Sequence, residues 1–184
     1  QTPGSHTVSV VDIERRKRVA DVAVPGRTRW CIYDPVRDTF FVNIAAPARI
    51  VAIDPREPTR IAREYEVPAA GPHGLDLDPA NGRLLCACDA GVLVATETSS
   101  GRVFGEVPLS GPPGVVFLQP QSRRLYVAIG EPGVIDVVDV DAMRRIEVVP
   151  TESGAHTLAL DRKRNTVFPL LPGSHRAQVF LEKP

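Results

Sequence analysis

Apolar residues in this chain come in short runs of four to six, and each run is bounded by Gly, Pro, Asn or Asp. The runs are rich in Val, Ile, Leu, Phe and Tyr, which is typical of β-strands, and they lack the 3.6-residue spacing of an amphipathic helix. Residues 71–109 illustrate this pattern, with predicted strands in the segments GLDLD, RLLCAC, GVLVATE and RVFGEVPL. The turn segments PANG and TSSG join them, with glycines that tolerate a positive φ. The chain is therefore predicted to be all-β, with antiparallel strands joined by short turns.

The turn that follows the first strand of each unit recurs at a nearly constant interval. Its four copies are YDPVRDTFFVNI, LDPANGRLLCAC, LQPQSRRLYVAI and LDRKRNTVFPLL, with anchor residues Asp34, Asp78, Gln119 and Asp161. These anchors are separated by 44, 41 and 42 residues. A four-stranded meander of this size cannot bury both of its faces alone, and radial stacking of such units forms a β-propeller. A β-sandwich is the alternative, but sandwich strands do not usually repeat their turn sequences at one fixed period.

The period divides the chain into a single propeller domain with incomplete ends. Residues 1–24 match the third and fourth strands of a blade. Blades of four strands are predicted at about 25–67, 68–109 and 110–150, and residues 151–184 match the first three strands of a last blade. The sequence thus predicts seventeen strands, a little over four blades.

Three interpretations account for this unfinished ring. The one we favour is that the chain is a partial arc of a longer propeller. A second copy of the chain is another way to complete the ring, because an open arc exposes sheet edges and apolar blade faces. The third interpretation is a four-bladed ring in which the first two strands complete the last blade.

Several segments resemble the YVTN-type repeats of bacterial seven-bladed propellers. These segments are GPHGLDLDP (71–79), FFVNI (40–44), RLYVAI (124–129), VVDIERRKRVADVAV (10–24) and IDVVDVDAMRRIEVV (135–149). The resemblance extends over essentially the whole chain and implies a WD40-like repeat architecture. Propellers of this pattern include lactonases, lyases, quinoprotein relatives and plain binding scaffolds. The resemblance therefore implies a fold without implying one activity.

Composition narrows the classes of partner. Lys+Arg and Asp+Glu balance at 22 each, which excludes the broad basic field of a nucleic-acid binder. No apolar run approaches the ~18 residues of a membrane-spanning helix. The three cysteines, Cys31, Cys86 and Cys88, lie inside apolar runs and are predicted to be buried free thiols. Relatives of this pattern are often exported to the bacterial cell envelope, whereas an odd number of cysteines favours a reducing compartment, so the sequence leaves the location open.

The candidate ligand site lies at the mouth of the predicted central channel, where the first strand of every blade begins. Counting back from the anchors places Arg29, His73, Pro113 and His156 at equivalent positions there. A protonated histidine beside an arginine can hold an anion, and a neutral one can ligate a metal or move a proton. Trp30 lies next to Arg29, and either forms a stacking wall for a ligand or packs in the core. The candidate channel-mouth residues are therefore Arg29, Trp30, His73 and His156.

These residues favour a binding scaffold that takes a small anionic ligand or a protein partner. The alternative is a lyase or lactone hydrolase that uses His73 and His156 with a divalent cation. Such a role is implied by the resemblance to streptogramin-inactivating lyases, which are propellers with a channel histidine and a divalent metal. In a purely structural role, the imidazole of a Gly-Pro-His-Gly segment satisfies backbone groups of its loop.

Two further sets of residues bear on these alternatives. Gluconolactonase-type propellers hold calcium with axial carboxylate and amide groups, and the candidates here are Asp76, Asn43 and Asp89, whose repeat positions differ. His6 and His175 lie in two GSH segments before predicted third strands, so we interpret them as turn residues. No Gly-x-Ser-x-Gly elbow, phosphate-binding loop or Cys-x-x-Cys pair is present, so nucleophilic catalysis has no support in the sequence.

Overall fold

The computed structural model describes residues 6–182, and within this range every element is a β-strand. The strands are β1 (Thr7–Asp12), β2 (Lys17–Ala23), β3 (Thr28–Asp34), β4 (Thr39–Ile44), β5 (Arg49–Ile53), β6 (Arg63–Glu66), β7 (Pro72–Asp78), β8 (Arg83–Cys88), β9 (Val92–Glu97), β10 (Val103–Pro108), β11 (Pro113–Gln119), β12 (Arg124–Ile129), β13 (Val134–Asp139), β14 (Arg144–Pro150), β15 (Leu158–Asp161), β16 (Thr166–Leu171), β17 (Arg176–Ala177) and β18 (Phe180–Leu181). The predicted all-β class is confirmed. Over residues 6–182 there is also no helix with the length and apolar character needed to span a membrane.

Three complete four-stranded sheets form the middle of the molecule, in the orders β3-β4-β5-β6, β7-β8-β9-β10 and β11-β12-β13-β14. Neighbouring strands are antiparallel and follow one another in the chain, so each sheet is a meander. The pair β1-β2 precedes them, and β15, β16 and β17 follow, with β18 also pairing with β16. These are the four-stranded blades that the repeat predicts.

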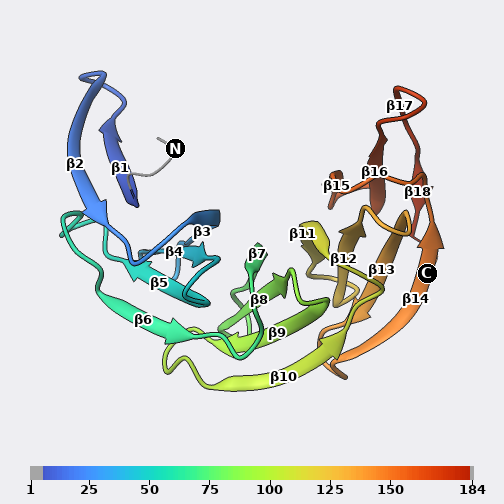
Figure 1. Cartoon of the computed structure of the whole chain (residues 1–184), viewed down its shortest axis with the longest axis horizontal. Coiled ribbons are helices and arrows are strands. Elements are labelled where there is room, and N and C mark those ends of the chain that lie inside the picture. The colour runs from blue at the N-terminus through green and yellow to red at the C-terminus, as the bar shows by residue number, and fades with distance from the viewer. Residues whose placement is uncertain (1–5, 183–184) are drawn as a thin grey trace.

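The blades are arranged around an open arc (Figure 1). The strands β3, β7, β11 and β15 lie on the inner side of the arc, and β2, β6, β10 and β14 lie on its outer side. The two ends of the described chain stand at the tips of opposite arms. The prediction of a four-bladed ring that closes on itself is therefore wrong, because the first and last strands of one chain do not meet.

Clusters of buried apolar residues fill the spaces between neighbouring sheets. Successive side chains of a strand point to opposite faces, so each inner strand contributes to two clusters. In β8, Leu85 and Ala87 pack with Val127 of the following sheet, whereas Leu84 and Cys86 belong to the cluster shared with the preceding sheet. All five are fully buried. Burying one leucine this completely contributes about 2 kcal/mol, so the stacking of sheets supplies stability that one meander lacks.

The anchor residues join each blade to the next. Asp34, Asp78 and Gln119 are 0, 1 and 0 % exposed although all three are polar. Arg123, in the next blade, donates to the Asp78 carboxylate, and the Gln119 amide donates to the carbonyl of Arg162 at 3.0 Å. These cross-blade bonds satisfy the groups that stacking buries, as buried polar groups require.

Two expectations from the sequence are corrected by the structure. The segment predicted as the third strand of the last blade forms two pieces of two residues, β17 and β18, which raises the number of strands to eighteen. Cys31 is exposed, whereas Cys86 and Cys88 are buried as predicted. Cys31 has an apolar position of the repeat, so its exposure reflects an absent neighbour rather than a polar environment.

We expect Gly101→Ala to destabilise the protein by about 3 kcal/mol, because it combines overpacking with a backbone that disfavours a Cβ. Gly101 has φ +74°, and a Cβ there would lie 2.3 Å from Cδ1 of the buried Tyr65 ring. Gly82, at φ +60° in the other turn of the same blade, is the matched control, since its Cβ would meet only the flexible end of Arg37. Gly82→Ala should cost about 1 kcal/mol, for the backbone alone.

Urea unfolding followed by the fluorescence of Trp30, the single tryptophan, measures both losses. Equal destabilisation by the two substitutions would contradict close packing of Tyr65 on the turn.

Candidate functional site

The segment Gly71-Pro72-His73-Gly74 brings an inner strand close to its neighbours on both sides. Gly71 adopts φ +69°, and a Cβ on it would lie 2.7 Å from Cβ of Asp89. A Cβ on Gly74 would lie 2.6 Å from the carbonyl oxygen of Gly114 in the next blade. Glycine is needed at both places because no larger residue fits without moving backbone or side chain. This local packing sets His73 beside Asp89.

Arg29, His73 and Asp89 form a polar cluster at the inner ends of two adjacent blades. His73 Nδ1 lies 2.8 Å from Asp89 Oδ1, and Arg29 donates from Nη2 to Asp89 Oδ2 at 3.2 Å. Arg29 Nη1 lies 3.5 Å from His73 Nε2. The side chains are 23 % (Arg29), 31 % (His73) and 39 % (Asp89) exposed, so solvent and small solutes reach them.

The hydrogen bonds in this cluster set the tautomer of His73. When the ring is neutral, the carboxylate of Asp89 accepts the proton on Nδ1, which leaves Nε2 as the basic nitrogen toward Arg29. Arg29 Nε is buried and has no hydrogen-bond partner. The cluster therefore contains a donor that its own residues do not satisfy.

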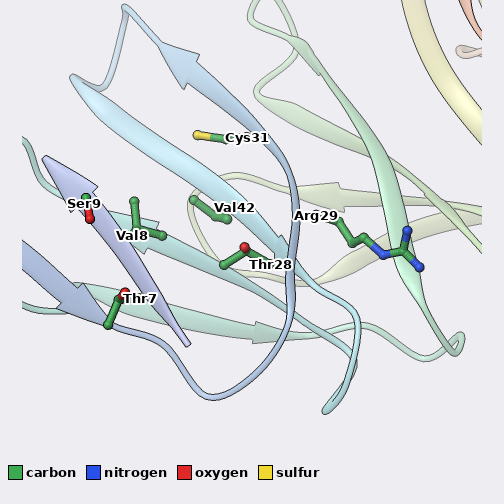
Figure 2. A pocket seen from close by; sticks show the side chains of 7 residues that line it. All are labelled: Thr7, Val8, Ser9, Thr28, Arg29, Cys31 and Val42. Carbon is green, nitrogen blue, oxygen red and sulfur yellow. The ribbon is translucent and has the colours of Figure 1, made fainter. Parts of the chain in front are cut away.

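The Arg29 side chain also borders a hollow of about 290 Å³ between β1 and the β3-β4 hairpin. Figure 2 shows the other six lining side chains around this hollow, while the guanidinium of Arg29 extends away from them toward the neighbouring blade. The hollow and the polar cluster thus share one residue, and Arg29 carries its charge to the cluster.

The structure brings together only part of the predicted site. His156 is exposed, and its Nδ1 faces the carbonyl of Gly154 at 2.8 Å within its own loop. Its backbone carbonyl accepts from Val115 of the preceding blade at 3.1 Å. Trp30 points into the apolar cluster between the first two complete sheets, so it packs in the core and does not line the polar cluster. His156 and Trp30 stay predictions as ligand contacts.

The two histidines of the GSH segments occupy a turn position. His6 and His175 have φ values of +42° and +54°, each directly before a third strand. Gly91 and Gly133 have the same place in two complete blades, with φ values of +75° and +87°. A shared left-handed backbone supports the interpretation of His6 and His175 as turn residues.

The candidate calcium ligands do not converge. Asn43 donates its side-chain amide to the carbonyls of His73 and Gly74 at 3.1 and 3.2 Å. Asp76 faces the next blade, where its Oδ2 accepts from the backbone N–H of Leu118. Across residues 6–182, no group of three or more His, Cys, Asp or Glu side chains is arranged to hold a metal ion. The residues present thus do not fit the divalent cation that the enzymatic alternative needs.

Sequence reasoning assigned Asp89 to a calcium site and missed its contact with His73. A signal for it was available in the repeat. The residues that follow the second strands at equivalent positions are Ala45, Asp89, Gly130 and Pro172, and among them only Asp89 is ionisable. An acid at a position that is otherwise small and apolar indicates a specific partner nearby.

Asp76 joins three blades at the inner side of the arc. Its Oδ2 accepts from Leu118 N–H at 2.6 Å and lies 3.5 Å from Nη2 of Arg162, while Arg162 Nε donates to the Leu118 carbonyl at 3.0 Å. The Asp76 side chain is 6 % exposed. Burial raises the pKa of this carboxyl above its usual value, because the N–H bonds from Leu118 and Leu77 and the charge of Arg162 only partly offset the desolvation.

Comparisons with known proteins support the fold alone. No family model matches the chain, and no curated protein matches it. Among solved structures, a chain of "Kuenenia stuttgartiensis Hydrazine Synthase" is similar, with a TM-score of 0.61 and 15 % sequence identity. The match covers 97 % of this chain and 78 % of that one. At this identity the likeness concerns the propeller-like arrangement of sheets and carries no activity.

Replacing Asp76 by Asn should change the pH dependence of stability. The folded-state pKa lies above the 3.8 of an unperturbed carboxyl, so the native protein loses stability as pH rises from about 4 through the folded-state pKa. Asparagine cannot ionise, and its amide loses one of the two N–H bonds, at a cost of roughly 1–3 kcal/mol. The stability advantage of native protein over variant should therefore be largest near pH 4 and shrink at higher pH.

Urea unfolding of both proteins at each pH measures this difference. A difference that grows with pH would contradict the prediction, because it would mean that the charged carboxylate is the more stabilising form.

Proposed function

We propose that this chain is a propeller-type binding scaffold that takes a small anionic ligand at the inner ends of its first two complete blades. The observation that carries the proposal is the convergence of Arg29 and His73, from adjacent blades, on Asp89 at 3.2 and 2.8 Å. The open sheet arrangement supports the broader part of the proposal, because blades of this kind present loops and inner strand ends around a shared axis.

The charge balance of the cluster indicates the chemistry of the ligand. With His73 neutral, Arg29 and Asp89 cancel each other, and the cluster has no net charge. Protonation of His73 adds one positive charge, and both ring nitrogens then donate. The unpartnered Nε of Arg29 offers a further donor. A carboxylate or phosphate provides the acceptor oxygens that such donors bind.

Metal-assisted lyase or hydrolase chemistry has less support. His73 and His156 do not share a ligand set, since His156 bonds within its own loop and His73 is held by Asp89. We therefore keep the binding function as the proposal and treat catalysis as its alternative, which metal analysis of the purified protein would test directly.

Isothermal titration with citrate and with inorganic phosphate tests the anion site. Arg29→Met should weaken binding by about tenfold or more, because it removes the fixed charge and its donors. Asp89→Asn should strengthen binding, because the competing carboxylate is lost. Affinity should rise as pH falls from about 8 to about 5, and His73→Gln should abolish that rise.

Arg16→Met is the matched control, because Arg16 is an exposed cation in the β1-β2 turn and makes no contact with the cluster. Its affinity and pH dependence should equal those of the native chain. Absence of binding for both anions, or equal losses in Arg16→Met and Arg29→Met, would overturn the proposed site.

A further inference from the structure

One face of the first complete blade is open at positions that the repeat buries elsewhere. Phe40 is 38 % exposed and Tyr33 is 42 % exposed, and Cys31 beside them is also exposed. Their rings pack on each other with centroids 4.8 Å apart, but no apolar cluster of the described chain includes them.

The equivalent residues of the next two blades are buried. Their exposed fractions are 0 % for Leu75, 7 % for Leu77, 0 % for Leu84, 1 % for Val116, 0 % for Leu118 and 0 % for Leu125. In each case the cover includes the second strand of the preceding blade. Leu85 and Ala87 of β8, for example, pack in the cluster that holds Val116, Leu118 and Leu125. Cys31, Tyr33 and Phe40 therefore lack a first-and-second-strand hairpin.

The strand that should pair with such a hairpin is present and unpaired on one edge. β1 has the place of a third strand, and it pairs only with β2. In a complete blade, β13 pairs with β12 over six residue pairs and also with β14. Between β1 and the β3-β5 strands lies a hollow of about 320 Å³, whose lining includes Val8, Val11 and Phe40. Both an open ladder edge and an apolar hollow thus mark the place of the absent hairpin.

The other end of the arc carries a hairpin of the required kind with its own face open. β15 and β16 are the first and second strands of the last blade, and Leu170 of β16 is 52 % exposed. Its repeat equivalents Ala87 and Ala128 are 0 % exposed because the following blade covers them. The third strand of this blade is weak, since β17 and β18 make two residue pairs each with β16.

We propose that a second copy of this chain closes the arc. The β15-β16 hairpin of one copy packs on β3-β4 of the other, and its β16 pairs with the free edge of β1. Leu170 then meets Phe40 as Ala87 meets Leu125 within one chain. The six-pair ladder of a complete blade replaces the four interrupted pairs of β17 and β18.

The geometry favours a symmetric pair over other occupants. Each copy has one open face of each kind, at the tips of opposite arms of the arc (Figure 1). A two-fold axis therefore makes the same join twice and leaves neither face uncovered. The ring then contains three complete blades from each copy and two shared blades. This inference does not depend on the anion site, because it concerns apolar faces and strand edges.

The mass of the 184-residue chain in solution, measured by light scattering after gel filtration, tests the proposal. We expect twice the 19.9 kDa of one chain. Phe40→Glu and Leu170→Glu each place a charge in both joins and should give the mass of one chain. Ile146→Glu is the matched control, since Ile146 is 41 % exposed on the outer strand β14, and it should keep the double mass.

Mixing the two monomeric variants distinguishes the proposed join from a head-to-head contact. One copy of each leaves one join intact, because the unaltered β3-β4 face meets an unaltered β16, so the mixture should recover part of the double mass. A dimer formed through two β3-β4 faces would instead persist in Leu170→Glu, and that result would overturn the proposal.

Reaction of Cys31 with a thiol reagent provides a second measurement that does not rely on any variant folding. Cys86 and Cys88 are buried within the chain, so Cys31 is the reporter. In the native pair its reaction should be about tenfold or more slower than in Phe40→Glu, because the reagent must await dissociation. A native chain with the mass of one copy and a freely reactive Cys31 would refute the inference, as it would if a flanking segment of a longer protein supplies the cover.

Discussion

The structure depends on the contact between the face of one four-stranded meander and the face of the next. A single meander has apolar side chains on both faces and too few residues to bury either. Stacking solves this for the middle blades, where Leu85 and Ala87 face one neighbour while Leu84 and Cys86 face the other. Stability therefore belongs to pairs of blades, as in other repeat architectures.

The same constraint explains the polar groups at the ends of the inner strands. Stacking buries the anchors Asp78 and Gln119, and each is satisfied by a group from the next blade. In the last blade, where no neighbour follows, the anchor Asp161 is only half-buried and bonds within its own turn. The incomplete ends of the arc thus appear as unburied repeat positions, and Cys31 and Leu170 are the clearest of them.

The candidate site uses the variation that the scaffold tolerates. The backbone near the axis is held by close glycine contacts and by cross-blade bonds such as that of Asn43 to the carbonyl of His73. Side chains at the inner strand ends are freer, because they face the space inside the arc instead of another sheet. Arg29, His73 and Asp89 meet there because two blades place their first strands side by side.

Much of the fold could be predicted from the sequence because the signals are local. The recurrence of the anchors Asp34, Asp78, Gln119 and Asp161 and the two-residue alternation in the apolar runs depend only on neighbours in the chain, and they determined the strands, the turns and the meander. The pairing of Arg29 and His73 with Asp89 spans 60 and 16 residues, and it depends on how the two blades pack. The exposure of Cys31 and the open ring likewise depend on which sheet faces which. The sequence by itself determined the repeating unit, and only the tertiary structure decided which copies of that unit are covered, because burial is a property of neighbouring sheets and not of the strand that carries the residue.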